Sequence, residues 1–379
     1  MKQASLSSAD VREKNAKRLL RYIYDHGSAS KQGISHELAM SLPTVTQNIN
    51  RWEELGIIEK TGQFESTGGR KAFGYHIAST LKVAIGVSIL KEFYHVTLVD
   101  LYGRPLFSKI IHTPFSKDDE YFQTLTSEIM LMVRKLELQD EQILGVKIAV
   151  QGLVSTDGKQ FVYGKILETD QFPLLEIVQQ KIKYPCAMIH DTEAAAMAEL
   201  WAQRDISDAV ILYLNRYFGG AVIIHGRIYQ GCELPSSILE HMTLYPGGIK
   251  CYCGKKGCIE SYCSAYALKR NAGEPLDSFF DKLRAGDAAA EKIWEEYLRN
   301  LAIAINNMRM LMDTEYIIAG HMLHYILPED INMLQQYVDS ESPFKTRNVK
   351  IRMSAYPEDS AAPGAAICLI KAYLDTLLG

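Results

Sequence analysis

The segment Glu240–Glu260, EHMTLYPGGIKCYCGKKGCIE, places one histidine and three cysteines in the order H-x9-C-x-C-x4-C. These residues are His241, Cys251, Cys253 and Cys258. One imidazole and three thiolates are a sufficient donor set for a closed tetrahedral zinc site. Because the protein would fill every coordination position, no position is left for an activated water, and the expected role of the zinc is structural. The alternative is four unrelated residues, since buried free cysteines are common.

The bulk composition is that of a globular protein with an ample core. The chain has 379 residues, of which 47% are hydrophobic and 23% charged, so two or three domains are expected. No apolar run reaches the ~20 residues that a membrane span needs, and the N-terminal residues lack the apolar core of a signal peptide. Seven cysteines, three of them clustered as metal ligands, fit a reducing compartment. We therefore expect a cytoplasmic protein without a membrane segment.

The N-terminal region has the pattern of a winged helix-turn-helix. An amphipathic helix is expected over residues 10–25, a short second helix over 30–37, and a third helix over 41–55. Two strands around a glycine-rich tip at 66–71 would form the wing. The apolar spacing of the third helix predicts that its core-facing residues are Val45, Ile49, Trp52 and Leu55.

The third helix and the wing tip carry the residues expected to contact DNA. Short polar side chains on an exposed helix face can read base edges and phosphates, and an Arg-Lys tip can enter a minor groove or lie along phosphates. The expected contacts are Ser41, Thr44, Gln47, Asn48, Arg51, Gly69, Arg70 and Lys71. Residues 1–77 hold eleven basic and eight acidic side chains, whereas the remainder holds 30 basic and 37 acidic ones, which agrees with nucleic-acid contact at the head only. The alternative is a helical protein-interaction module with a solvated polar face.

From about residue 79 onward, β-branched runs alternate with helical stretches. One such run is VAIGVSIL at 83–90, and helices are expected over 118–136 and 193–203. This alternation predicts α/β layers. We therefore divide the chain into a DNA-binding domain, residues 1–78, and an α/β body, residues 79–379.

Three segments together resemble the ROK family (repressors, open reading frames and sugar kinases). The cysteine segment resembles the family signature G-H-x9-C-x-C-G-x2-G-C-x-E, with Glu260 matching its final position and Glu240 replacing the glycine before the histidine. HDTEAAAMAE at 190–199 resembles the family segment NDANxAAxxE. The N-terminal segment resembles the DNA-binding head of ROK repressors, which ROK kinases lack. Over about residues 80–378, the resemblance implies a two-lobed, ribonuclease-H-like (actin-like) body with a zinc knuckle at 241–258.

The chain departs from ROK sugar kinases where those enzymes hold nucleotide phosphate. Ser88 stands in place of the Asp of the motif GxDxGGTK. Arg216 and Tyr217 stand in place of glycines in the motif GTGxGGG, and residues 319–321 match a third, glycine-rich turn poorly. Backbone amides close around phosphate only where such glycines leave room. We therefore predict that the chain is not an enzyme and has no catalytic residue.

The family residues that contact the sugar are better matched in this chain than the residues that hold phosphate. The resemblance places Asp191 at the position of the kinase base, and without ATP this carboxylate would accept hydrogen bonds from sugar hydroxyls. It also implies that His241, bound to zinc through one ring nitrogen, has the other free to meet a sugar hydroxyl or a nearby acceptor of the protein. The expected ligand-binding residues are Gln151, Gly152, His190, Asp191, His241 and Glu260. Ile238 replaces a family glutamate that contacts the sugar, which predicts a ligand unlike plain glucose or one bound more weakly. Alternatively, Asp191 only caps the helix that follows it.

These observations lead to one hypothesis and two alternatives. The hypothesis is a sugar-responsive transcriptional regulator, most simply a repressor, that contains structural Zn2+ and binds a palindromic DNA operator as a homodimer or a dimer of dimers. The first alternative is a divergent ROK sugar kinase that uses Asp191 as its base. The second is a constitutive DNA-binding protein whose body only dimerises.

Overall fold

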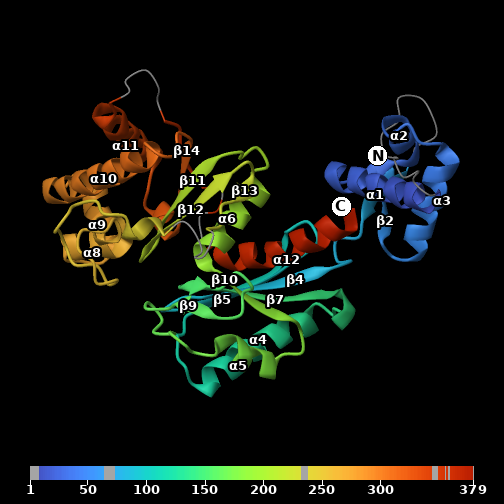
Figure 1. Ribbon diagram of the computed structural model, residues 1–379, viewed down its shortest axis with the longest axis horizontal. Coiled ribbons are helices and arrows are strands. Elements are labelled where there is room, and N and C mark those ends of the chain that lie inside the picture. The colour runs from blue at the N-terminus through green and yellow to red at the C-terminus, as the bar shows by residue number, and fades with distance from the viewer. Residues whose placement is uncertain are drawn as a thin grey trace, which may run out of the picture.

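The computed structural model describes residues 8–63, 73–231, 238–343, 349–354, 356 and 359–378 (Figure 1). A small head and a larger body are visible, and the long C-terminal helix runs from the centre of the body to the head. The predicted wing-tip residues Gly69, Arg70 and Lys71 lie outside the described residues. The last strand of the head ends at Ile77, and the first strand of the body begins at Val83.

The head is a winged helix-turn-helix, as predicted. Its elements are α1 (Ser8–His26), β1 (Ala29–Ser30), α2 (Lys31–Glu37), α3 (Leu42–Glu54), β2 (Ile58–Gln63) and β3 (Phe73–Ile77). The three strands form an antiparallel sheet in the order β1-β3-β2. Ser30 and Ser41 cap α2 and α3, because their side chains accept hydrogen bonds from Gly33 N and Thr44 N respectively.

One predicted core residue of α3 is on the surface. Leu55 is 60% exposed, whereas the other three predicted core residues of the helix are buried. The helix ends at Glu54, so Leu55 is its C-cap residue, and the chain turns at the following Gly56, which has φ +68°. The apolar spacing of this helix was therefore extended one step too far.

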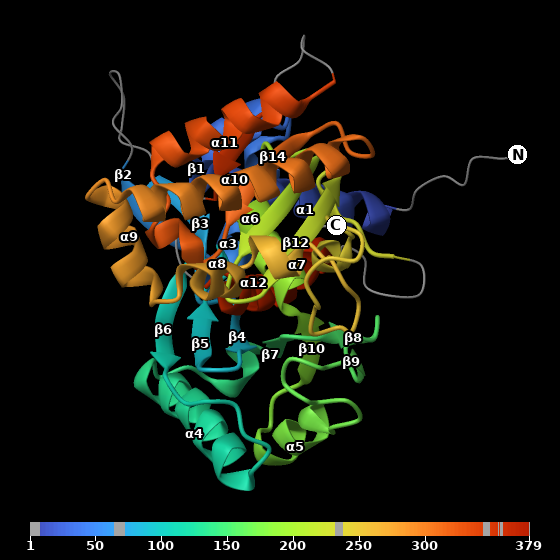
Figure 2. The same cartoon turned by 90° about the vertical axis from the view of Figure 1, so that its left-hand side faces the viewer.

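The first lobe of the body is a five-stranded sheet covered by helices. Its elements are β4 (Val83–Ile89), β5 (Tyr94–Val99), β6 (Pro105–Ile111), α4 (Asp119–Lys135), a 3-10 turn (Asp140–Gln142), β7 (Ile143–Val150), β8 (Leu153–Val154), β9 (Phe161–Tyr163), α5 (Leu174–Lys181) and β10 (Cys186–His190). The strand order is β10-β7-β4-β5-β6, with β4, β5 and β6 antiparallel and β7 and β10 parallel to β4. Helices α4 and α5 cover its outer face (Figure 2).

The second lobe repeats this topology. Its elements are β11 (Ala209–Leu214), β12 (Phe218–Ile224), β13 (Arg227–Ile228), α7 (Glu260–Cys263), α8 (Ala265–Ala272), α9 (Leu276–Arg284), α10 (Ala288–Arg309), β14 (Glu315–Ala319), a 3-10 turn (His321–His324), α11 (Pro328–Glu341) and β15 (Ile351–Met353). The order β13-β12-β11-β14-β15 again joins an antiparallel meander to two parallel strands. The repeat confirms the predicted two-lobed α/β body.

Two helices, α6 (Asp191–Ala202) and α12 (Ala361–Leu378), lie between the lobes. Helix α12 packs on β4, β7 and α6, and α6 also packs on β12 of the second lobe. Both crossings require glycine. A Cβ on Gly364 would lie 1.7 Å from Ala194 O, and one on Gly86 would lie 1.9 Å from Ala362 O. The first sheet, α12 and α6 therefore form one closely packed stack.

The length and composition of α12 would also permit a membrane span. Half of this helix is buried inside the protein, however, where it packs against α6 and the first sheet. Burial of this kind is what the core helix of a folded domain shows.

The head is joined to the body by packing as well as by the chain itself. Tyr24 of α1 stacks on Tyr102 of the β5–β6 turn, with ring centroids 5.0 Å apart and planes inclined by 5°. Tyr24 Oη donates to Leu101 O at 3.2 Å, and Tyr102 Oη donates to Ile77 O at 3.2 Å. From the other side, Trp201 Nε1 of α6 donates to Tyr102 O at 2.8 Å. We call Tyr24, Tyr102 and Trp201 the aromatic junction.

Candidate metal centre and ligand cavity

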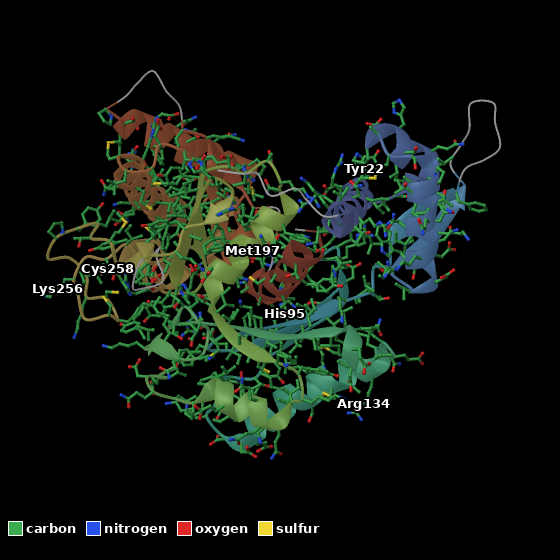
Figure 3. All side chains as sticks on the ribbon, turned by 45° about the vertical axis from the view of Figure 1, so that its right-hand side comes forward. Tyr22, His95, Arg134, Met197, Lys256 and Cys258 are labelled. Carbon is green, nitrogen blue, oxygen red and sulfur yellow. The ribbon has the colours of Figure 1, made fainter. Side chains whose placement is uncertain are left out.

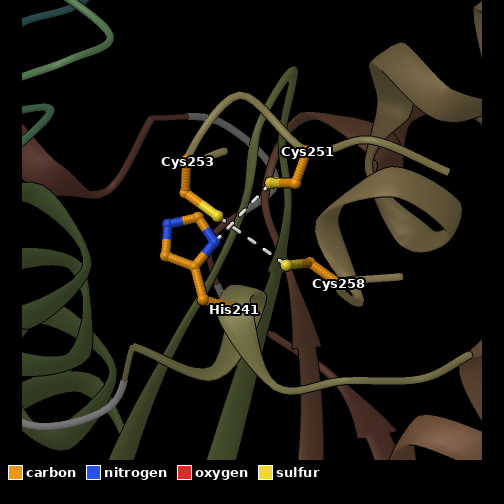
Figure 4. A group of neighbouring side chains, drawn as sticks. All are labelled: His241, Cys251, Cys253 and Cys258. Carbon is orange, nitrogen blue, oxygen red and sulfur yellow. Dashed lines mark hydrogen bonds between the residues drawn. The ribbon is translucent and has the colours of Figure 1, made fainter. Parts of the chain in front are cut away.

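The predicted metal ligands converge in space (Figure 4). One donor atom from each of His241, Cys251, Cys253 and Cys258 lies within 4.8 Å of the other three. His241 Nδ1 is 3.7 Å from Cys251 Sγ, and Cys253 Sγ is 3.8 Å from Cys258 Sγ. Zinc bond lengths of about 2.0 Å to nitrogen and about 2.3 Å to sulfur place tetrahedral ligand atoms about 3.5–3.8 Å apart. The group can therefore hold a metal ion.

The knuckle that carries the cysteines is a short hairpin with glycine turns. Cys251 N donates to Lys255 O at 2.8 Å, and Gly257 has φ +79°. A Cβ on Gly257 would lie 1.7 Å from Tyr245 O, so only glycine fits there. Burial raises the pKa of the Cys251 thiol to about 12. A bound cation would offset this cost, because thiols coordinate metals as thiolates.

A cavity of about 380 Å³ lies between the lobes, beside the metal ligands. Its lining includes five of the six predicted ligand-binding residues, namely Gln151, Gly152, His190, Asp191 and His241. The rest of its described wall consists of Leu153, Val162, Tyr163, Lys165, Ile166, Thr192, Tyr213, Asn215, Tyr217, Phe218, Gly219, Ile238, Glu240 and Tyr252. The fold therefore brings these five predicted residues, which come from both lobes, to one cavity.

Glu260, the sixth predicted ligand-binding residue, is not among the residues that line this cavity. Its side chain is buried, and its Oε2 accepts a hydrogen bond from Phe218 N at 2.6 Å. Phe218 itself lines the cavity. The contact that the structure gives Glu260 therefore positions the first residue of β12, and direct contact with a ligand stays a prediction.

Asp191 begins α6 and faces the cavity. Its Oδ1 accepts from Thr192 N at 2.9 Å and lies 3.2 Å from His190 Nε2. Burial raises the pKa of Asp191 to about 7 and lowers that of His190 to about 4. At neutral pH the imidazole is therefore uncharged, while the carboxyl group is close to half ionised. Asp191 contacts the backbone of its own helix and also lines the cavity, so the two sequence interpretations of this residue do not exclude each other.

Glu240 is a cavity residue that sequence reasoning missed. It lies on the 3-10 turn Leu239–His241, is 8% exposed, and faces the cavity. Its Oε1 is 4.0 Å from His241 Nε2, and its Oε2 is buried without a hydrogen-bond partner among the described residues. Burial raises the pKa of its carboxyl group to about 8. The signal that could have found it is a carboxylate directly before a predicted metal ligand.

The predicted DNA-contacting residues on α3 fall into two groups. Gln47 and Arg51 are exposed on the outer side of the head. Thr44 and Asn48 are half-buried and bonded within the helix, since Asn48 Nδ2 donates to Thr44 O at 2.9 Å and Ser41 Oγ lies 2.8 Å from Thr44 Oγ1. Gln47 and Arg51 are thus the two predicted contacts within α3 whose side chains are exposed.

Ser88 and Arg216, two of the residues predicted to replace kinase phosphate-motif residues, both contact other side chains of the protein. Ser88 Oγ donates to Asp359 Oδ2 at 2.5 Å, and His95 Nδ1 lies 3.1 Å from the same oxygen. Arg216 of the second lobe forms an ion pair with Glu92 of the first. The cavity that Asp359 borders measures only about 20 Å³.

Known proteins resemble both parts of the chain. The winged helix-turn-helix DNA-binding family matches residues 12–59, and the ROK family matches residues 84–372. The Escherichia coli K12 DNA-binding transcriptional dual regulator NagC is 25% identical over 342 residues, which cover 84% of each chain. The xylose repressor of Bacillus subtilis is 22% identical over 375 residues, which cover 97% of each chain.

Solved structures show the same fold. A ROK family transcriptional regulator, a homologue of the Escherichia coli MLC protein, matches 97% of this chain and 98% of its own with a TM-score of 0.73 and 22% identity. A ROK family glucokinase from Streptomyces griseus matches 76% of this chain and 98% of its own, with a TM-score of 0.64 and 20% identity. The glucokinase match covers less of the chain than the regulator match does. Because the family profile spans most of the chain, the protein belongs to the ROK family and carries a winged helix-turn-helix at its N-terminus.

Proposed function

We propose that the protein is a cytoplasmic, sugar-responsive transcriptional regulator, most simply a repressor. The observation that carries this proposal is a winged helix-turn-helix packed directly onto a sugar-kinase-like body with an interlobe cavity. Relatives over most of the chain are named N-acetylglucosamine repressor and xylose repressor. We further propose a homodimer or dimer of dimers, since paired heads would contact the two half-sites of a palindromic operator.

The aromatic junction offers a route from the cavity to the head. Helix α6 begins at Asp191 in the cavity wall and carries Trp201 near its other end, where the indole holds the Tyr102 backbone. Twelve helical residues extend about 18 Å, so a ligand contact at one end can move the other end as a rigid body. To release DNA, the sugar must bind one arrangement of the heads better than another, by about 1–3 kcal/mol.

We also propose that the His241 and cysteine group holds structural zinc. The donor set and its spacing fit tetrahedral Zn2+ without a position for water, so the ion would supply no chemistry to a ligand directly. It would fix His241 through Nδ1 and leave Nε2 on the cavity side. In this role the metal holds the wall that contains His241 and Glu240.

We propose that the body does not act as a kinase. The Ser88–Asp359 hydrogen bond and the Arg216–Glu92 ion pair fill positions where the kinase motifs would admit phosphate. ATP-dependent phosphorylation of a sugar that Asp191→Ala abolishes would instead support the enzyme alternative.

The function is tested by selecting genomic DNA fragments with the purified protein at a stated salt concentration, with and without a panel of sugars. We expect one palindromic site whose recovery changes with one sugar. A specific site that no sugar affects would support the constitutive alternative. The absence of any specific site would remove the regulator proposal.

Arg51→Ala is expected to weaken operator binding about tenfold, because an exposed arginine on α3 would lose a phosphate or base contact. Arg134→Ala is the matched control, since Arg134 lies on α4 in the first lobe, far from the head (Figure 3). Fluorescence anisotropy with a labelled operator at fixed salt measures both variants. Equal operator affinities for Arg51→Ala and the control would remove this residue from the DNA interface.

The buried Asp191 predicts a pH dependence of stability. Its pKa in the folded protein is about 7, above its ordinary value of 3.8, so between these pH values the folded state retains a proton that the unfolded state has lost. Its contribution to stability is complete below about pH 4 and is lost as pH rises to about 7, at about 1.4 kcal/mol per pH unit. Asp191→Asn should flatten this part of the profile. Urea unfolding of both proteins at pH 5 and pH 7 measures the difference, and identical pH slopes would contradict the assignment.

A further inference from the structure

We propose that the ligand of the interlobe cavity is an amino sugar with a free, positively charged amine, rather than a neutral or N-acetylated sugar. This inference rests on the proposed function and specifies its ligand class. The cavity combines one buried and one partly buried carboxyl group, neither with a lysine or arginine partner among the described residues, with several aromatic rings. Such a combination can attract a cation both through its carboxyl groups and through its ring faces.

The two cavity carboxyl groups, Asp191 and Glu240, have no lysine or arginine partner among the described residues. Each lies close to a histidine, Asp191 beside His190 at 3.2 Å and Glu240 beside His241 at 4.0 Å. Glu240 is 8% exposed, and its Oε2 has no hydrogen-bond partner in the described part of the chain. A buried carboxylate without a compensating partner is costly, so the site gains most from a ligand that brings a cation or a strong donor.

Aromatic rings form much of the remaining wall. Tyr217 and Tyr252 lie edge to face, with centroids 5.6 Å apart and planes inclined by 78°, and Tyr163 and Phe218 also line the cavity. The face of a tyrosine ring attracts an ammonium group, and the attraction is stronger where water is excluded. An acetylated amine carries no charge and would lack this cation–π attraction.

The metal group adds to the negative character of this wall. Three thiolates and a neutral imidazole exceed the charge of a divalent cation, so an occupied centre would carry a net negative charge beside His241. Lys165 is the only lysine or arginine among the described lining residues, and its side chain is exposed. A positively charged ligand would stabilise the ionised forms of Asp191 and Glu240, which no lysine or arginine among the described residues does.

Neutral donors nearby are suited to the hydroxyl groups of the same ligand. Gln151 Oε1 accepts from Lys91 N at 3.0 Å, and Asn215 Oδ1 accepts from His321 N at 2.7 Å. Because both amide oxygens are engaged, both amide NH2 groups are left to donate. A sugar ring that carries hydroxyl groups and one ammonium group would thus find donors for its hydroxyl groups, and carboxyl groups and aromatic faces for its ammonium group.

Matched sugar trios test the inference. Glucosamine, glucose and N-acetylglucosamine, and the corresponding galacto and manno trios, are titrated into the full-length, zinc-loaded protein by calorimetry at a pH where the amine is protonated. We expect the amine to bind at least about tenfold more tightly than both other members of at least one trio. Equal or tighter binding of the neutral or acetylated member, or no binding in any trio, overturns the inference. If a neutral sugar binds and alters operator binding, the proposed function stands and only the ligand class is wrong.

Glu240→Gln isolates the charge, because it keeps the size of the side chain. We expect the affinity for the amine to fall at least about tenfold, and the affinity for the matched neutral hexose to fall clearly less. Zinc content is measured in parallel, since Glu240 precedes the ligand His241. If this variant loses zinc, Tyr217→Leu replaces it, with Tyr217→Phe as its control: only loss of the ring should weaken amine binding. An equal loss of affinity for charged and neutral sugars in either test overturns the inference.

Discussion

Cys253→Ser is expected to lower the zinc content from about one ion per chain to nearly none. Cys253 supplies one of four converging donors, and its Sγ lies 3.8 Å from Cys258 Sγ. A serine hydroxyl is a poor zinc ligand at neutral pH, so the three remaining donors would hold the metal far more weakly. The knuckle would then lose the bond that fixes His241 in the cavity wall. Sugar binding should fall at least about a hundredfold with it, whereas operator binding by the separate head should change little.

The measurements for this variant are elemental analysis, calorimetric sugar titration and operator anisotropy on the same preparation. Cys186→Ser is the matched control, because Cys186 lies outside the metal group and donates to Tyr184 O at 3.2 Å, a bond that a serine hydroxyl can also form. The control should retain both zinc and sugar binding. Normal zinc content in Cys253→Ser would contradict the ligand assignment itself.

The metal group could be predicted from the sequence because its determinants are local. The three cysteines lie within eight residues, and glycine at 254 and 257 permits the positive φ angles of the turns that bring them together. The head was predictable for a similar reason, since serine caps and apolar spacing mark α2 and α3 directly. Even there, the predicted core face of α3 included one residue too many, because Leu55 is the C-cap residue after the last helical position and is exposed.

The cavity was only partly predictable, because its wall is assembled from distant parts of the chain. Asp191 and Gln151 were recognised through family resemblance, whereas the only local signal for Glu240 is its place directly before the predicted metal ligand His241, which does not by itself indicate burial against the same space. Glu260 shows the opposite case. Its place in the signature suggested ligand contact, while the contact that the structure provides is with the backbone of Phe218, 42 positions away in sequence. Tertiary packing decides both outcomes.

The aromatic junction could not be predicted from the sequence. Trp201 and Tyr102 are 99 positions apart, and Tyr24 belongs to another domain. Gly103 allows Trp201 to approach the β5–β6 turn closely. It has φ +76°, and a Cβ there would lie 2.3 Å from Trp201 Nε1. A glycine in a strand turn is so common that it does not predict such an approach.

Trp201→Phe is expected to separate sugar binding from the DNA response. The substitution keeps an aromatic ring in contact with the β5–β6 turn but removes the donor to Tyr102 O. One hydrogen bond contributes about 1 kcal/mol, which is comparable to the coupling that the proposed mechanism needs. The sugar-induced change in operator affinity should therefore fall about fivefold, while the affinities for sugar alone and for operator alone stay within about twofold of the parent values. Operator anisotropy with and without saturating sugar measures all of these quantities.

A double-mutant cycle then tests whether the junction acts as a unit. Tyr24→Phe keeps the stacked ring but removes the donor to Leu101 O on the head side. If the signal passes through Tyr102 from Trp201 to Tyr24, the double variant should lose no more of the response than either single variant, because breaking the route twice has the effect of breaking it once. Additive losses would mean that the two contacts contribute separately. A full response in Trp201→Phe would assign the coupling to another contact, of which the packing of α12 between α6 and α1 is the next to examine.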